Sequence, residues 1–128
     1  MPFKIKLSET KDYICLDYFG NVTNDDLTNS IAGCTQLYRE TGVSLYLADC
    51  TDMHATHSIL DIFGKVDAFE SLEMKKDFKE ALIVTRESES REKLNFYETA
   101  CLNRGYNVRV FESKEDALQW LLKGKKKI

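Results

Sequence analysis

Short apolar runs alternate along this chain with longer stretches in which apolar residues recur at every third or fourth position. The short runs have the length and composition of strands, and the longer spacing is typical of amphipathic helices. The strand-like runs cover residues 3–7, 13–19, 43–48, 81–85 and 107–111. Helices are expected to begin near Thr23, near Ser58, at Ser88 or Ser90, and after Ser113. The predicted order is two strands, then three helix–strand pairs, then a final helix.

This order predicts the topology of the sheet. A short polar stretch, residues 8–12, separates the first two strands and suits a hairpin, so these strands should run antiparallel. A strand followed by a helix and another strand favours parallel pairing through a right-handed crossover. The sequence therefore predicts an α/β fold with a single mixed, mostly parallel five-stranded sheet flanked by four helices.

Length and charge narrow the class of protein. A chain of 128 residues suits one domain over residues 1–128, and four lysines in its last six positions predict a frayed basic tail at 123–128. The remaining residues are more acidic than the net charge of −3 indicates, which argues against a general nucleic-acid binder. No apolar run is long enough to span a bilayer and no apolar leader precedes the first strand, so we expect a cytoplasmic protein.

The motifs of the common enzyme classes are missing from the sequence. It contains no glycine-rich dinucleotide loop, no Walker motif and no Gly-x-Ser-x-Gly turn, so neither a nucleotide cofactor nor hydrolase chemistry is expected. The four cysteines are dispersed without a Cys-x-x-Cys pair, which favours reduced thiols in a reducing compartment. We therefore predict a protein that is not an enzyme and that has no cofactor.

One polar cluster stands apart from this pattern. Asp49, Cys50, Asp52, His54 and His57 lie within nine residues after a predicted central strand, in a stretch that we expect to be a loop. Cys50 with either histidine could form a thiolate–imidazolium pair, or the thiol and both histidines could bind zinc. The simpler alternative is a polar loop that follows a strand-end cysteine.

Two segments near the end of the chain carry a family pattern. Residues 103–111 read Asn-Arg-Gly-Tyr-Asn-Val-Arg-Val-Phe, and residues 115–121 read Glu-Asp-Ala-Leu-Gln-Trp-Leu. The turn at residues 20–23 and the strand that ends at Asp49 add to the pattern. Together they resemble the SpoIIAA-like family, the relatives of STAS and anti-sigma-antagonist domains, over nearly the whole chain.

The resemblance implies a function in protein regulation. Antagonists of that type bind a partner kinase or regulator, and a serine or threonine that opens their second helix is phosphorylated within an Asp-Ser-x-Gly-like motif. Here no Asp-Ser pair and no following glycine are present, and Ser58, or less well Thr56, stands at the matching place. The resemblance thus implies a partner or phosphoacceptor surface at Asp49, Asp52, Thr56 and Ser58, whereas the residues alone indicate that Ser58 is a helix N-cap.

Three functional hypotheses follow. The first is a non-enzymatic STAS-like regulatory or protein-interaction domain, alone or as a homodimer, with aromatic residues such as Phe96, Trp120, Tyr18 and Tyr46 available for contact. The second is a small-molecule or lipid-binding module with an apolar pocket at the carboxyl edge of the sheet. The third is a thiol- or metal-dependent enzyme centred on Cys50.

Overall fold

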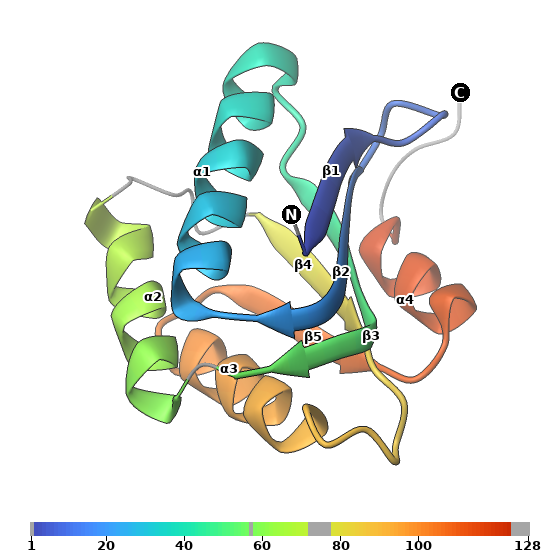
Figure 1. The fold of residues 1–128 in the computed structure, drawn as a ribbon. Helices are drawn as coiled ribbons and strands as arrows, with labels where there is room; N and C mark the ends of the chain where they lie inside the picture. The colour runs from blue at the N-terminus through green and yellow to red at the C-terminus, as the bar shows by residue number, and fades with distance from the viewer. Residues whose placement is uncertain (1, 57, 72–77, 124–128) are drawn as a thin grey trace.

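A mixed five-stranded sheet runs through the middle of the computed structural model, which describes residues 2–56, 58–71 and 78–123 (Figure 1). Its strands are β1 (Phe3–Leu7), β2 (Ile14–Val22), β3 (Leu45–Ala55), β4 (Lys79–Ile83) and β5 (Asn107–Phe111). The strands lie side by side in sequence order, with β1 antiparallel to β2 and all other neighbours parallel. The predicted topology is confirmed.

Helices cover both faces of this sheet. α1 (Asn24–Thr41), α2 (Ile59–Ser71) and α3 (Arg91–Asn103) connect parallel strands, and α4 (Lys114–Leu121) follows β5. Each new strand is added at the same edge of the sheet, so right-handed connections place all three connecting helices on one face. α4 lies on the opposite face (Figure 1). We call these the three-helix face and the α4 face.

Local sequence signals set both ends of α1. The side chain of Thr23 accepts a hydrogen bond from the backbone N–H of Asp26, whose carboxylate accepts one from the backbone N–H of Thr23. This capping box satisfies N–H groups that have no partner within the helix. Gly42 ends the helix with a φ of 75°, a left-handed conformation that glycine reaches at little cost. The start of the helix lies where the sequence predicts it.

Buried apolar side chains form one cluster on each face of the sheet. The larger cluster lies on the three-helix face and includes the rings of Phe69, Phe78 and Tyr106, whose centroids are 5.5–5.8 Å apart. Tyr18 and Tyr46 are buried in the same cluster, so the prediction that they reach the surface is wrong. The smaller cluster lies under α4 and consists of Leu47, Ala81, Ile83, Ala117 and Leu121.

Two other aromatic residues singled out in the sequence lie against neighbouring side chains. The ring of Trp120 packs on Phe111 at 5.7 Å between centroids, with the ammonium of Lys79 4.8 Å from the Trp120 ring. The ring of Phe96 meets Phe63 of α2 edge to face at 5.1 Å. Both rings are therefore engaged within the chain itself.

β3 is longer than the sequence predicts, and residues 50–55 belong to it rather than to a loop. The second half of β2 provides the neighbouring strand: Phe19 pairs with Asp52, and the pairing continues to the end of both strands. A register shift between Asp17 and Phe19 interrupts the alternation of buried and exposed residues, which is why the periodicity of this segment does not show in the sequence. Both strands bend near this point (Figure 1).

Candidate functional site

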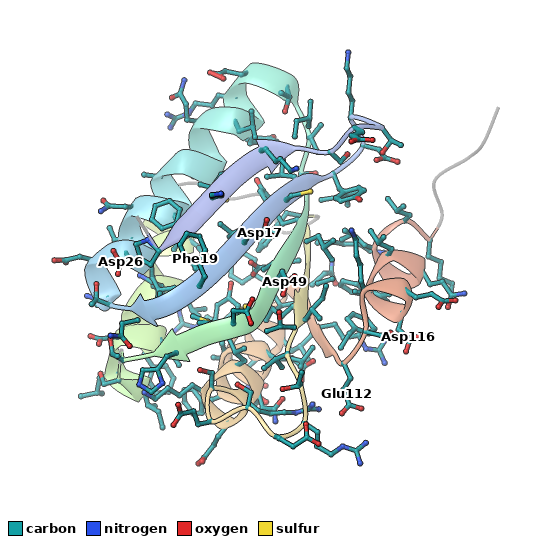
Figure 2. All side chains as sticks on the ribbon, turned by 45° about the vertical axis from the view of Figure 1, so that its right-hand side comes forward. Asp17, Phe19, Asp26, Asp49, Glu112 and Asp116 are labelled. Carbon is teal, nitrogen blue, oxygen red and sulfur yellow. The ribbon has the colours of Figure 1, made fainter. Side chains whose placement is uncertain are left out.

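The residues predicted to form a partner surface lie along β3 and just beyond it, and they do not gather in one place. Asp49 is half-buried in a groove on the α4 face, where its carboxylate accepts hydrogen bonds from the N–H and the hydroxyl of Thr51 at 3.0 and 2.7 Å (Figure 2). Asp52, Thr56 and Ser58 are exposed and follow farther along the chain. About 20 Å of extended strand separates Asp49 from the end of β3. Asp49 and Ser58 therefore belong to different surfaces.

Ser58 caps the start of α2. Its hydroxyl accepts a hydrogen bond from the backbone N–H of Asp61 at 3.1 Å, and the carboxylate of Asp61 accepts one from the backbone N–H of Ser58 at 2.9 Å. This reciprocal pair is a second capping box, so the N-cap interpretation describes the local geometry. Two residues earlier, the N–H and the hydroxyl of Thr56 both donate to the carbonyl oxygen of Val22 at 3.0 Å.

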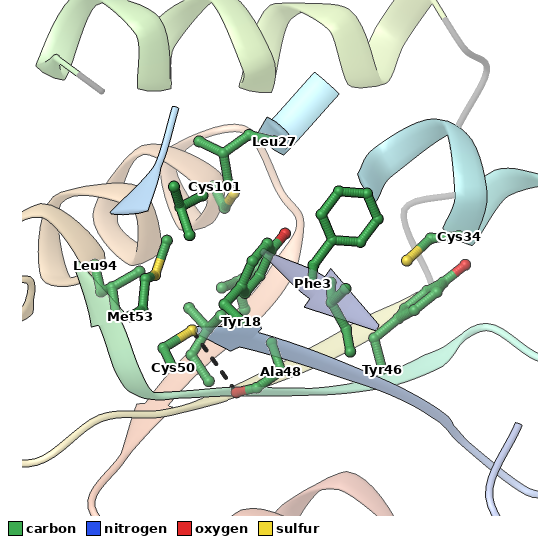
Figure 3. Packing of buried hydrophobic residues seen from close by; sticks show 14 of the residues in the cluster. Phe3, Tyr18, Leu27, Cys34, Tyr46, Ala48, Cys50, Met53, Leu94 and Cys101 are labelled. Carbon is green, nitrogen blue, oxygen red and sulfur yellow. Dashed lines mark hydrogen bonds between the residues drawn. The ribbon is translucent and has the colours of Figure 1, made fainter. Parts of the chain in front are cut away.

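Cys50 and His54 lie on the same strand in different surroundings. The thiol of Cys50 is fully buried on the three-helix face, 3.9 Å from the carbonyl oxygen of Ala48 (Figure 3). Burial, more than the acidic groups nearby, raises the pKa of this thiol well above its ordinary value. The imidazole of His54 is partly exposed, and its Nδ1 lies 2.7 Å from the carboxylate of Glu89. The structure does not bring this thiol and this imidazole together, and His57 lies outside the described residues.

The remaining thiols and acidic groups give no stronger support to a thiol- or metal-dependent enzyme. Cys15, Cys34, Cys50 and Cys101 are all free, and all except Cys15 are buried. A buried thiol that keeps its proton is a poor nucleophile and a poor metal ligand. Within residues 2–56, 58–71 and 78–123, no three His, Cys, Asp or Glu side chains are arranged to hold a metal ion.

A cavity lies on the three-helix face, between the sheet and the helices that cover it. Its empty volume, with the open space at its mouth included, is about 750 Å³. The volume in which the centre of a water molecule can lie is about 80 Å³. One water needs roughly 10–15 Å³ by that second measure, so the cavity has room for several waters or a small ligand. Its wall is mainly apolar and includes Leu16, Leu27, Ile31, Ile62, Leu82 and Leu94.

The position of this cavity differs from the pocket that the sequence predicts at the carboxyl edge of the sheet. It lies over the face of the sheet instead, because α2 packs on α3 and stands away from the strands (Figure 1). Ile59 and Phe63, near the start of α2, lie outside this cavity. Each is 43% exposed, whereas Ile62 is 2% exposed and faces the cavity.

Few polar groups line the cavity, and two of them are joined. The hydroxyl of Tyr97 donates a hydrogen bond of 2.6 Å to Oε1 of Glu80. Burial raises the pKa of Glu80 to about 7, and the hydrogen bond from Tyr97 only partly opposes this shift. Near neutral pH the Glu80 carboxyl is therefore divided between its neutral and charged forms. On the neighbouring part of the wall, the hydroxyl of Tyr18 lies 2.7 Å from that of Ser30.

Lys65 of α2 lies where the cavity approaches the surface. The residue is 8% exposed, and its Nζ donates to the carbonyl and side-chain oxygens of Asn24 and to the hydroxyl of Thr28 at 3.3–3.5 Å. Burial lowers the pKa of Lys65 to about 8, although the carboxylates of Asp61 and Asp25 partly oppose this shift. Its ammonium group is therefore held by neutral oxygen atoms of α1.

Sequence reasoning missed Glu80 and Lys65 as site residues, although each carries a weak signal. Glu80 lies two residues before Leu82 on β4, so it faces the same side of the sheet as that buried residue. Lys65 lies three residues after Ile62, on the apolar side of α2. A charged residue in an apolar stripe is the signal that could have identified both positions.

The sequence has a family relationship that agrees with this fold. The family model described as SpoIIAA-like matches residues 13–122. The chain belongs to the SpoIIAA-like family. The match includes the whole of β2 through α4 and therefore all the residues that line the cavity.

Solved structures of SpoIIAA-like fold show the same architecture. An uncharacterised protein of the DUF3478 family with a SpoIIAA-like fold, from Shewanella loihica PV-4, is 22% identical, with a TM-score of 0.58 over 93% of this chain and 91% of that one. The unphosphorylated anti-sigma factor antagonist SpoIIAA is 10% identical, with a TM-score of 0.55 over 94% and 98%. The Bacillus cell fate determinant SpoIIAA in its phosphorylated form is 12% identical, with a TM-score of 0.54 over 92% and 97%. The comparison with curated proteins found no match.

The surface of this SpoIIAA-like domain exposes several apolar side chains at the start of α2. Leu60 is 78% exposed, and Ile59 and Phe63 are each 43% exposed. Residues four apart in a helix lie on the same side, so Ile59 and Phe63 form a continuous strip beside Leu60. We call Ser58, Ile59, Leu60 and Phe63 the α2 tip.

None of the helices in the described parts of the chain combines the length and apolar character needed to cross a membrane.

Proposed function

We propose that residues 1–128 act as a single, non-catalytic regulatory domain that binds a protein partner through the α2 tip. The observation that carries this proposal is the exposed apolar strip of Ile59, Leu60 and Phe63, which begins directly after the capping residue Ser58. Apolar side chains grouped on one exposed helix face are typical of interaction surfaces. This surface replaces the broader one expected from the sequence, because Asp49 lies on the other face of the sheet.

Family membership and surface charge support the same proposal. One SpoIIAA of similar fold is named as an antagonist of an anti-sigma factor, which is a protein partner. In this chain, Asp52, Asp61 and Glu89 belong to the segments that lead into or flank the α2 tip, and each is at least partly accessible. We therefore propose a partner that places apolar side chains against the tip and basic side chains around it.

Ser58 is also the better candidate for a phosphoacceptor. Its hydroxyl is accessible at a helix N-terminus, where the free N–H groups and the helix dipole favour a phosphate. The carboxylate of Asp61 lies against the same residue and would repel that phosphate, so modification would weaken the capping box. Phosphorylation would thus change the α2 tip itself, which is the expected mode of control if Ser58 is modified.

The experiment that tests the partner surface is affinity capture from native cells with two matched variants. Leu60→Asp places a charge on the α2 tip, and Leu102→Asp places the same charge on α3, where Leu102 is 54% exposed. We expect one defined protein to be retained by the unmodified chain and by Leu102→Asp but lost with Leu60→Asp. Equal recovery with both variants, or recovery of a second copy of this chain alone, would contradict the proposal of a different protein partner.

A second candidate function rests on the cavity. A mainly apolar hollow with a few polar groups on its wall is the usual form of a small-molecule site. The water-accessible space is small, so a ligand longer than a few atoms would require movement of side chains or of α2. We propose that the domain binds a small, mainly apolar ligand there, and that the ligand adjusts the position of α2.

Methyl NMR of the full chain tests this second function. Titration with decanol should shift the methyl signals of Leu16, Leu82 and Leu94, which line the cavity, in a saturable way. The methyl signals of Ala117 and Leu121, on the α4 face, provide the control because they belong to the other cluster. Uniform shifts on both faces, or no saturable shift, would contradict a specific cavity site.

We also propose that the chain resides in a reducing compartment, because its thiols are free. Four free cysteines, three of them buried, suit a reducing compartment such as the cytoplasm.

A further inference from the structure

The cavity and an outer groove meet at Lys65. The groove lies between α1 and α2 and is lined by Thr28, Arg39 and Leu60 among others. Lys65 and Ile31 belong to the walls of both spaces, so these two side chains form the partition between them. A ligand that enters from the groove must pass the ammonium group of Lys65 before its remainder reaches the apolar cavity.

Within the described parts of the chain, the ammonium of Lys65 has no charged partner at contact distance. Its polar contacts are three neutral oxygens of α1 at 3.3–3.5 Å, all at the long end of the hydrogen-bond range. Among the residues that the structure describes, no carboxylate forms a salt bridge with it. A buried ammonium without a counterion is costly, since most of its hydration is lost. An anion that arrives with a ligand would remove this cost.

We propose that the cavity takes an apolar carboxylate, with its hydrocarbon part inside the cavity and its carboxylate against the Nζ of Lys65. This inference rests on the second candidate function and names the chemistry of its ligand. A cationic ligand would meet repulsion from Lys65 at the partition. A dianionic phosphate would be repelled more strongly than a carboxylate by the acidic groups on the same two helices, Asp25 and Asp61.

The charged and titratable groups around the site agree with a monoanion. On the helices, Asp25 and Asp61 act on Lys65, and Arg39 adds a positive charge in the groove. Without a ligand, the pKa of Lys65 is lowered to about 8. A bound carboxylate would raise this pKa. Inside the cavity the titratable groups are Glu80, Tyr18, Tyr46, Tyr97, Cys34 and Cys50, and burial raises the pKa of each.

The first test compares ligands of equal chain length on the full chain at pH 7. We expect decanoate to bind at least tenfold more tightly than decanol, and decylamine and decyl phosphate to bind more weakly than decanoate. Equal affinity for decanoate and decanol would overturn the carboxylate inference while leaving the cavity function in place. No saturable binding of any of the four would overturn both.

Two variants assign the preference to Lys65. Lys65→Met keeps an unbranched side chain of nearly the same length and removes the charge, so the ratio of decanoate affinity to decanol affinity should fall from at least tenfold to about one. Lys65→Arg keeps the charge and should retain the preference. Persistence of the full preference in Lys65→Met would overturn the assignment.

The unmodified protein provides an independent test that does not depend on any variant. Lys65 gives up its proton as the pH rises above about 8, so decanoate affinity should fall there by up to about tenfold per pH unit. Decanol affinity should not follow this change. Affinity should also rise about threefold to fourfold for each methylene from hexanoate to decanoate, because each added group enters the cavity. A flat pH profile, or a flat chain-length series, would overturn the proposal.

Discussion

The two faces of the sheet are covered in different ways. On the α4 face, one short helix lies directly on the strands, and Ala117 and Leu121 meet Leu47, Ala81 and Ile83 in a small cluster (Figure 1). On the three-helix face, α1 and α3 border the cavity, and α2 packs on α3 through Phe63 and Phe96. Several helices that support one another need not fill the space beneath them, and the cavity lies there.

The difference also extends to polar groups. Lys65 is buried on the three-helix face, and Glu80 lines the same cavity, whereas ionisable groups of the α4 face such as Asp17, Asp49 and Lys114 line an outer groove and are half-buried or exposed. Ionisable groups inside a protein are costly unless they are paired, and well-packed apolar contacts are the more stabilising alternative. The α4 face therefore combines a small packed cluster with an outer polar groove, and the three-helix face is where we propose that a ligand binds.

The largest expected effect compares two leucines on helices that face the sheet. Leu121→Ala on the α4 face should lower the free energy of unfolding by about 3–4 kcal/mol, because it empties a packed site. Leu94→Ala should cost less, about 2 kcal/mol, because Leu94 already borders empty space and loses fewer contacts. Urea unfolding measures both. Equal losses would break the proposed difference between the faces.

The second effect concerns the pH dependence of stability. The folded chain binds the Glu80 proton more tightly than the unfolded chain, since burial raises the pKa from 4.5 to about 7. Stability from this group is therefore complete below about pH 4.5 and declines as the pH rises to about 7, by roughly 2–3 kcal/mol. Glu80→Gln should remove this decline in urea unfolding measured across that range.

A companion variant sharpens the assignment to Glu80. Tyr97→Phe removes the hydrogen bond that favours the charged carboxyl, so the decline should extend to higher pH rather than disappear. An unchanged decline in Glu80→Gln would show that another group is responsible.

The third effect is smaller and opposite in sign. Lys65→Met should raise the free energy of unfolding at pH 7 by about 1 kcal/mol, because it removes a buried ammonium whose contacts, among the described residues, are with neutral oxygens. The gain should shrink between about pH 8 and 10.5, since the folded protein then loses the Lys65 proton before the unfolded chain does and becomes more stable itself. Chemical unfolding at pH 7 and pH 10 checks both parts. A loss of stability at pH 7 would mean that the lysine serves the fold rather than a ligand.

The smallest effect belongs to the α2 tip. Leu60→Asp and Leu102→Asp should each change the free energy of unfolding by no more than about 0.5 kcal/mol, because both side chains are mostly exposed. Thermal unfolding of the two variants beside the unmodified chain is the measurement. A large loss in Leu60→Asp alone would place Leu60 in the fold and would remove it from the proposed partner surface.

Much of the fold could be predicted because its signals are local. Thr23 and Gly42 define α1 through hydrogen bonds and backbone conformations that span only a few residues. The hairpin between β1 and β2 and the crossovers that follow it depend on segment order and loop length. Residues 50–55 escaped prediction because their strand pairing depends on a register shift relative to β2, which is not a property of either segment alone.

The site was harder to predict because burial of a polar group is a property of the assembled molecule. The sequence drew attention to Cys50 and His54, which are close along the chain but lie in separate surroundings. It passed over Glu80 and Lys65, which lie fifteen positions apart and line one cavity. Their shifted pKa values arise from side chains of several elements around them.

The order of apolar runs and helical spacings thus predicted five strands and the direction of each, and two segments near the end of the chain carried the resemblance to the family. Periodicity and capping act within a few residues, and right-handed crossovers leave few other topologies. Only the tertiary structure decided that α2 stands away from the sheet, that a cavity remains beneath it, and that Lys65 lies at its outer wall. Those features depend on how helices distant in the sequence share one space, and no local pattern encodes the volume that they leave empty.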